Sequence, residues 1–260
     1  MNISTSLLLL AVMAICENAF ADEAILDGKW RGSGGAALSI SSGNTNSKSL
    51  NLTADAARMT SDDKLSLYVQ ILASRSESTA NGVTSTSTTA NQWMAGTRFD
   101  HTVSGEIFGF GGLEFSRDQI KALALRSVAS GGLGYHLIKT DQNQWDIIGG
   151  LAYRADQYSP PGLLINNEMK NSLSTTELLL GEESSHSLSE STSFKQKLVV
   201  NPNLSRNGNR AAFDASLLVA LNKTMSLSMT LQDRFDSRAQ PPVKNNDMLF
   251  FTGINVKFGG

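Results

Sequence analysis

The chain has 260 residues, 40% of them hydrophobic and 18% charged, and its formal net charge is only −2. A charge so close to balance argues against a nucleic-acid-binding surface and against a strongly acidic binding role. The single cysteine, Cys16, lies near the N-terminus, so the rest of the chain offers no disulfide, thiolate ligand or thiolate nucleophile.

The N-terminal segment has the pattern of a secretory signal peptide. The apolar run Leu7–Ile15 is followed by Ala19-Phe20-Ala21, a small-x-small cleavage site. We expect residues 1–21 to be a cleaved signal and residues 22–260 to form one domain. A lipoprotein signal ending at Cys16 is the rival reading, but Ile15 is too bulky for the position before a lipidated cysteine.

The remainder lacks any run of 18 apolar residues and instead shows apolar residues at every second position. In one segment, for example, Leu65, Leu67 and Val69 alternate with Ser66 and Tyr68. Such alternation predicts strands with one apolar and one polar face, as in a membrane-spanning barrel. About twelve strands are predicted, at residues 29–41, 46–58, 64–75, 91–100, 106–117, 123–138, 144–156, 173–184, 192–201, 210–221, 225–236 and 247–258.

The connections between these strands sort by length. The longest, at 76–90, 157–172, 202–209 and 237–246, all fall on one side of a barrel whose other turns are short. Bacterial outer-membrane barrels have this arrangement, with short periplasmic turns and longer extracellular loops. Ser76–Ala90 is rich in Ser and Thr, and we expect it to be a solvated loop.

The last strand has the form of a barrel-closing strand. Phe250, Ile254, Val256 and Phe258 lie on one face of it. Gly253, Val256 and Phe258 resemble the assembly signal of outer-membrane barrels, Gly-x-x-apolar-x-aromatic. The resemblance implies that periplasmic chaperones and the outer-membrane assembly machinery are partners during biogenesis.

Further stretches carry a resemblance to a family. They are Trp30-Arg31-Gly32, the run from Leu38 to Asn46, Phe115–Asp118 and Gly131–Tyr135. Together with the closing strand they resemble the YdiY-like, salt-stress-induced outer membrane proteins, a family classed as domain of unknown function 481. This implies a single barrel in the outer membrane of a Gram-negative cell, linked to salt or osmotic stress, and it gives no catalytic residues to carry over.

Charged residues recur on the polar faces of the predicted strands. Because a charge facing lipid near the midplane costs about 2 to 4 kcal/mol, we expect these side chains to line the lumen. They would either set the selectivity of a water-filled pore or pair across a small lumen and fill it. The candidates are Asp55, Arg98, Glu114, Arg126, Asp146, Arg154, Glu177, Lys195, Lys197, Asp214, Arg234 and Lys257.

The sequence shows no catalytic or cofactor constellation. Its glycine clusters lie within strands and lack the following helix that a phosphate-binding loop requires. His101, His136 and His186 are too scattered for a metal site and fall at the periplasmic side, away from external substrates. An enzyme acting on lipid or peptide would have to use acidic residues at the outer rim, such as Asp118 with Asp156 or Asp236.

We therefore expect an all-β protein, a transmembrane antiparallel up-and-down β-barrel of about twelve strands, of the Gram-negative outer-membrane type. Its expected function is that of a non-enzymatic narrow pore or envelope-stabilising element, without cofactor or metal. It should be a monomer in contact with outer-membrane lipid and lipopolysaccharide and should not bind nucleic acid. The alternatives are a barrel enzyme at the outer rim, or a plugged barrel that binds partners through Ser76–Ala90 and Gln157–Ser172.

Overall fold

The computed structural model describes residues 26–41, 45–80, 83–165, 168–204, 208–239 and 244–259. The predicted signal peptide lies outside these residues. Within them there is no helix long and apolar enough to cross a membrane.

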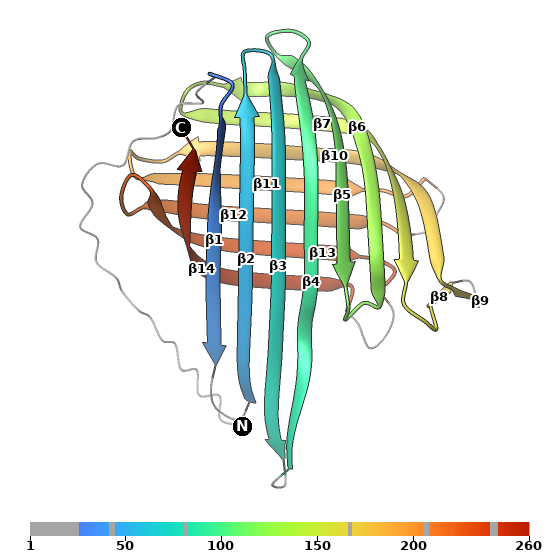
Figure 1. Ribbon diagram of the computed structural model, residues 1–260. Helices are drawn as coiled ribbons and strands as arrows, with labels where there is room; N and C mark the ends of the chain where they lie inside the picture. The colour runs from blue at the N-terminus through green and yellow to red at the C-terminus, as the bar shows by residue number, and fades with distance from the viewer. Residues whose placement is uncertain are drawn as a thin grey trace, which may run out of the picture.

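Twelve antiparallel strands close into a barrel in the order β1-β14-β13-β12-β11-β10-β7-β6-β5-β4-β3-β2, and β8 and β9 form a separate hairpin (Figure 1). The predicted fold class is confirmed. The strands are β1 (Trp30–Ser41), β2 (Thr45–Met59), β3 (Asp63–Ala80), β4 (Val83–Thr102), β5 (Ile107–Asp118), β6 (Leu123–Lys139), β7 (Asn143–Tyr158), β8 (Leu163–Ile165), β9 (Glu168–Lys170), β10 (Ser172–Ser187), β11 (Thr192–Asn201), β12 (Arg210–Ala220), β13 (Met225–Asp236) and β14 (Asn246–Gly259).

The expectation of a loop at Ser76–Ala90 is wrong. β3 and β4 continue through this segment as a long hairpin, with pairs such as Glu77↔Thr86 and Thr79↔Thr84. The segment has no hydrophobic alternation to reveal a strand, whereas its threonines favour extended backbone. The small β8–β9 hairpin, inside the predicted loop 157–172, was also not predicted.

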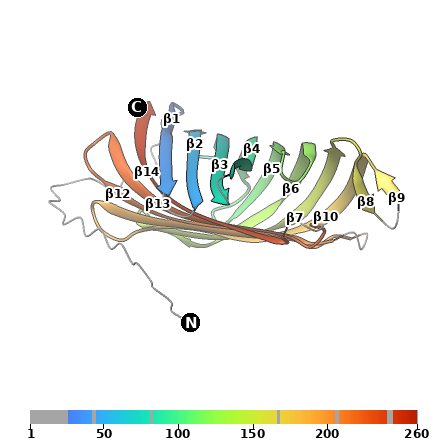
Figure 2. The same cartoon turned by 90° about the horizontal axis from the view of Figure 1, so that it is seen from below.

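The barrel is flattened. In Figure 2, β2 to β6 form one wall and β10 to β13 the other, and in Figure 1 the strands of the two walls run nearly at right angles. Barrel strands tilt by about 35–45° from the axis, so strands on opposite walls cross at roughly twice that angle. Flattening brings inward side chains of the two walls within reach of one another.

The two ends of the barrel differ. The connections at residues 60–62, 103–106, 140–142, 188–191 and 221–224 are short, and we call this the short-turn end. At the other, the long-loop end, lie the longest connections, residues 159–171, 202–209 and 237–245. This matches the predicted parity, apart from the β3–β4 hairpin.

The burial pattern is that of a membrane barrel. Large apolar side chains such as Leu52, Ile71 and Phe115 are exposed on the outer face, whereas the largest fully buried side chains are Arg154, Glu177 and Asp156. The polar side chains are therefore inside and the apolar ones outside, as lipid requires.

A small apolar cluster occupies the part of the lumen nearer the short-turn end. It consists of Phe108, Phe110, Ile148 and Leu179, with Val199 packed against it. Gly134 makes room for this cluster, since a Cβ there would collide with the ring of Phe108. The lumen is thus partly filled by side chains of its own wall.

Candidate functional site: the charged lumen

The strand register decides which side chains face the lumen, because residues paired across neighbouring strands point to the same face. Arg154 is buried, so it marks the inward face of β7, and its pairing partners Val128 and Thr175 mark the inward faces of β6 and β10. Further pairs, such as Arg98↔Gly112 and Lys197↔Asp214, extend this assignment to the other strands. All the lumen-lining candidates lie on this inward face: Asp55, Arg98, Glu114, Arg126, Asp146, Arg154, Glu177, Lys195, Lys197, Asp214, Arg234 and Lys257.

Near the long-loop end, four arginines converge on three carboxylates. We call this group the outer arginine cluster. It is formed by Arg126, Asp156, Arg154, Glu177, Arg210, Asp236 and Arg238.

Asp156 is at the centre of the cluster. Arg126 on β6 donates two hydrogen bonds to its carboxylate, from Nε to Oδ1 at 2.7 Å and from Nη2 to Oδ2 at 3.0 Å. Arg154 Nη1 and the Tyr158 hydroxyl donate to Oδ2, at 2.7 and 3.0 Å. Bidentate guanidinium–carboxylate pairs are among the strongest polar contacts in proteins, so this carboxylate is firmly held.

Glu177 holds the other side of Arg154. Arg154 Nε lies 2.8 Å from Glu177 Oε1, and Arg210 reaches the same carboxylate from β12 with Nη2–Oε2 at 2.5 Å. The side chains of Arg154, Asp156 and Glu177 are all wholly buried. Burial of unpaired charge would be prohibitive, so the chain satisfies each carboxylate with more than one arginine.

The cluster also spans the lumen. Arg126 Nη2 on β6 lies 3.7 Å from Asp236 Oδ2 on β13, and β7, β10, β11 and β12 separate these two strands in the barrel order. Nearby, Lys121 Nζ in the β5–β6 connection lies 2.6 Å from Asp247 Oδ2 on β14. Charge pairs therefore join opposite walls near the long-loop mouth.

A neutral contact joins the walls further inside. Gln70 Nε2 on β3 donates to Gln232 Oε1 on β13 at 3.0 Å, and also to Asn51 Oδ1 at 3.2 Å. Between β3 and β13 lie β2, β1 and β14. This contact narrows the lumen at a second level.

The third level is nearer the short-turn end, and we call it the inner bridge. Arg98 Nη1 on β4 donates to both oxygens of Glu183 on β10, at 2.7 and 2.9 Å. In the barrel order, β5, β6 and β7 lie between these two strands, so the pair crosses the lumen. Asp100 accepts from Arg98 Nε at 2.6 Å, and Lys197 Nζ lies 2.7 Å from Glu183 Oε1. The bridge therefore contains two cations and two carboxylates.

Aromatic rings support the inner bridge. The Arg98 guanidinium carbon lies 4.8 Å from the ring centroid of Phe110 and 5.9 Å from that of Phe108. Cation–π contact at this distance stabilises a guanidinium in a partly dry setting. The bridge is only partly buried, because the side chains of Arg98 and Glu183 are 19% and 23% exposed.

Other lumen candidates contact residues on nearby strands and not on the opposite wall. Glu114 accepts from the Tyr68 hydroxyl at 2.8 Å, Asp55 from Ser33 at 2.6 Å, and Asp214 from Arg234 at 2.7 Å. Asp146 Oδ1 lies 2.6 Å from His136 Nδ1. Lys195 and Lys257 lie on the inward face of β11 and β14.

Several residues of these networks were missed from the sequence. Glu183 lies in a polar stretch of β10 where both faces carry polar side chains, so alternation gave no signal. Arg210 and Asp247 lie at strand ends, and Lys121 and Arg238 lie in connections. Strand register places Glu183, Arg210 and Asp247 on the inward face. The contacts of Lys121 and Arg238 with Asp247 and Asp156 bring these two residues into the lumen.

The acidic residues considered for an enzyme do not meet as a catalytic group. Asp156 and Asp236 join the outer arginine cluster, whereas Asp118 accepts from the backbone amides of Ile120 and Lys121. The ring contacts of the histidines go to Asp63, Asp146 and Asn143, near the short-turn end. In the described part of the chain no group of three His, Cys, Asp or Glu residues could hold a metal ion.

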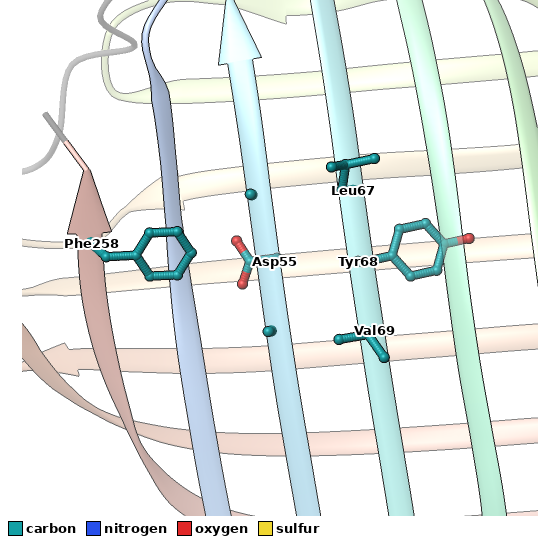
Figure 3. Close-up of a pocket in the computed structure, with 7 residues that line it drawn as sticks. Asp55, Leu67, Tyr68, Val69 and Phe258 are labelled. Carbon is teal, nitrogen blue, oxygen red and sulfur yellow. The ribbon is translucent and has the colours of Figure 1, made fainter.

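The assembly-signal residues lie at the seam between β1 and β14. Val256 pairs with Gly34 and Phe258 with Gly32, both facing outward, whereas Gly253 pairs with Ala37 facing inward. Figure 3 shows the Phe258 ring lying across β1 toward β2, at the edge of a shallow hollow of about 200 Å³ on the outer face.

The family described as "Protein of unknown function, DUF481" matches residues 34–258. No curated protein matches the chain.

Among solved structures, an outer membrane channel from Pseudomonas putida F1 is 10% identical, with a TM-score of 0.48 over 92% of this chain and 97% of that one. The translocator domain of the autotransporter NalP from Neisseria meningitidis is 13% identical, with a TM-score of 0.46 over 90% of each chain. The NanC porin is 8% identical, with a TM-score of 0.46 over 88% of this chain and 97% of that one.

Proposed function

The chain belongs to the DUF481 family, whose description is that of proteins of unknown function, and from its lumen we propose that it is a non-enzymatic outer-membrane barrel acting as a narrow pore, closed at rest by ion pairs. In this proposal the short-turn end faces the periplasm and the long-loop end faces outward. The solutes are ions and small polar molecules, because a flattened barrel of twelve strands leaves little free width.

The observation that carries the proposal is the inner bridge. Arg98 and Glu183 come from strands that are not neighbours, so the pair blocks the lumen without holding the wall together. Both side chains keep some contact with water, so salt screens this pair more than it screens the wholly buried pairs of the outer arginine cluster. Each side chain also has a second partner on its own wall, Asp100 for Arg98 and Lys197 for Glu183. The bridge can therefore open without leaving an isolated charge.

Ionic strength is the physical variable to which such a bridge responds. Screening acts over about 10 Å at 0.1 M salt and over about 3 Å at 1 M, so partly exposed pairs weaken as salt rises. A pore closed by partly exposed ion pairs would open more often in concentrated salt. Within the proposal, this response would explain how a protein that resembles salt-stress-induced proteins responds to salt.

A specific observation favours a second candidate, an envelope-stabilising element with a permanently closed lumen. The outer arginine cluster is wholly buried at Arg154, Asp156 and Glu177, and its members bind one another through several contacts. Buried pairs are much less sensitive to salt than the inner bridge. If this cluster never opens, the barrel passes nothing.

The experiment that separates the two is single-channel recording from the full-length barrel, refolded and inserted into a planar bilayer. The test variant is Arg98→Gln with Glu183→Gln, which removes the bridge and keeps side-chain size. The matched control is Asp214→Asn with Arg234→Gln, which removes an ion pair between the neighbouring strands β12 and β13.

We expect brief openings in the unmodified protein, long openings in the bridge variant and unchanged behaviour in the control. Silence in all three, with folded protein shown by heat-modifiable migration, would favour the envelope element. Equal activation by both double variants would show that lumen charge, rather than the bridge, closes the pore.

A further inference from the structure

The seam between the first and last strands is paired over only part of its length. β1 and β14 pair from Arg31↔Gly259 to Ala37↔Gly253, and the pairing stops there. Yet β1 continues to Ser41 and β14 begins at Asn246. Toward the long-loop end, the facing edges of these two strands are therefore not joined within the described residues.

The two strands remain ordered on their other sides. β1 pairs with β2 up to Ser41↔Ser47, and β14 pairs with β13 down to Phe235↔Asn246. The opening is therefore a split between two intact strands and not a frayed end. Figure 1 shows β14 lying beside β1 near the C-terminus and then curving away behind it.

A cavity of about 260 Å³ lies at this split, and both outward-facing and lumen-facing residues line it. Leu38 and Phe250 face outward, whereas Leu72 faces the lumen. No backbone pairing between described residues of β1 and β14 closes the sheet beyond Ala37↔Gly253, and residues of both strand edges line the cavity there. The split thus connects the lumen to the outer, lipid-facing surface.

The side chains at the split suit an alkyl chain. Leu38 and Phe250 are 73% and 67% exposed, well above the 38% of Leu52 on the neighbouring strand. On the lumen side the lining is mixed: Ala37, Leu72 and Leu249 are apolar, whereas Ser39, Ser49, Ser74 and Thr89 are polar. The outward end therefore favours a hydrocarbon, and the lumen end favours a polar group.

The inner end of the cavity holds an unused hydrogen-bond donor. Asn51 lines the cavity and is only 4% exposed, and its Oδ1 accepts from Gln70. No acceptor for its Nδ2 lies within the described part of the chain. The Nδ2 atom is itself buried, so a ligand oxygen reaches it only when the Asn51 side chain turns toward the cavity. A buried donor without a partner is costly, so a hydrogen bond to such an oxygen would favour that movement.

We propose that the split is a lateral binding site for a single-chain amphiphile, whose oxygen-bearing head accepts a hydrogen bond from Asn51 and whose alkyl chain leaves between Leu38 and Phe250 into the membrane. The site goes beyond the proposed pore and stands without it, because it uses neither the inner bridge nor the outer arginine cluster. The head group lies inside the lumen and the tail lies in lipid.

Photolabelling of the full-length barrel in phospholipid vesicles tests the site. The first probe is dodecanoate with a diazirine close to its carboxylate, and the second is dodecanoate with the diazirine at the end of the chain. Labelled residues are identified by mass spectrometry. We expect the first probe to label the lumen side, at Asn51 and Leu72, and the second to label the outward residues Leu38 and Phe250.

The variant Asn51→Leu removes the donor at nearly constant volume, and Thr53→Val is its matched control on the same inward face of β2. Lumen-side labelling by the first probe should fall at least fivefold in Asn51→Leu and stay unchanged in Thr53→Val. Labelling confined to outward side chains around the whole barrel, or equal lumen labelling in Asn51→Leu, would overturn the proposal. Neither readout depends on conductance, so a silent pore would leave it standing.

Discussion

The ring of Phe258 occupies the space that a side chain at Gly32 would need. A Cβ at Gly32 would lie 2.5 Å from Phe258 Cζ, and the two residues are paired across the seam between β14 and β1. An aromatic ring over a cross-strand glycine shields exposed backbone and fixes the pairing register. The residue that ends the predicted assembly signal is therefore also a packing element of the closed barrel.

Valine at position 32 should weaken barrel closure. Its branched side chain would crowd the backbone oxygen of Asp55 as well as the Phe258 ring, and overpacking of this kind costs about 1 to 3 kcal/mol. The free energy of unfolding, measured by urea titration in lipid vesicles with tryptophan fluorescence, should fall by that amount. The control is Gly34→Val, because a Cβ at Gly34 meets nothing within 4 Å. Equal losses in both variants would mean that β propensity and lipid exposure, not the crowding at Gly32, set the result.

Assembly should depend on the half of β14 that pairs with β1. Val256→Ser with Phe258→Ser removes the apolar residues of the signal beside Gly34 and Gly32, and we expect the chain to remain unassembled. Met248→Ser with Phe250→Ser removes similar apolar surface from the half of β14 not paired with β1, and it should assemble. Heat-modifiable protein in the outer-membrane fraction is the measurement. Normal levels in the first variant would refute the assignment of the signal.

Glu177 should contribute more to stability than Arg154, although both are wholly buried. Glu177→Gln leaves Arg154 and Arg210 facing each other without their shared carboxylate, and breaking a buried pair in this way costs about 3 to 5 kcal/mol. Arg154→Met leaves Glu177 with Arg210 and Asp156 with Arg126, so the loss should be only about 1 kcal/mol.

Urea unfolding of these two variants in the same vesicles gives the comparison. Asp214→Asn with Arg234→Gln serves as a reference, because that pair is about one third exposed and should change stability little. An Arg154 variant as unstable as the Glu177 variant would mean that the cluster acts as one unit and that every arginine in it is needed for stability.

If the barrel is the proposed pore, the open probability of the unmodified protein should rise with salt. The inner bridge is partly exposed and weakens as ionic strength increases, so openings at 1 M KCl should be longer than at 0.1 M, beyond the change in bulk conductivity. Single-channel dwell times measure this. The variant Arg98→Gln with Glu183→Gln should show dwell times that no longer depend on salt, and a dependence that persists there would place the gate elsewhere.

The sequence predicted the wall of this barrel better than its interior. Alternation within each strand sufficed to place Arg98 and Glu177 on the inward face, because a strand's two faces are set by local geometry. It could not pair Arg98 with Glu183, since that contact depends on how far the two walls approach each other. Flattening is a property of the closed barrel and cannot be predicted from the sequence of any single strand.

Two local features also escaped prediction, for different reasons. The sequence from Ser76 to Ala90 consists mostly of serine, threonine and other polar residues, so the hydrophobic pattern that identifies strands is absent. The split beyond Ala37↔Gly253 leaves β1 and β14 looking like ordinary strands, with Leu38 and Phe250 in regular alternation. Only the pairing of strands at opposite ends of the chain shows that the seam is open.

An interior organised around Arg154, Asp156 and Glu177 gives this protein an unusual relation to temperature. Hydration of charged groups becomes less favourable on heating, so the cost of keeping these groups away from water declines as the temperature rises. Most proteins have apolar interiors whose advantage levels off under the same conditions. Heating should therefore loosen the peripheral hairpins and the open seam first, while the ionic centre of the barrel is the last part to melt.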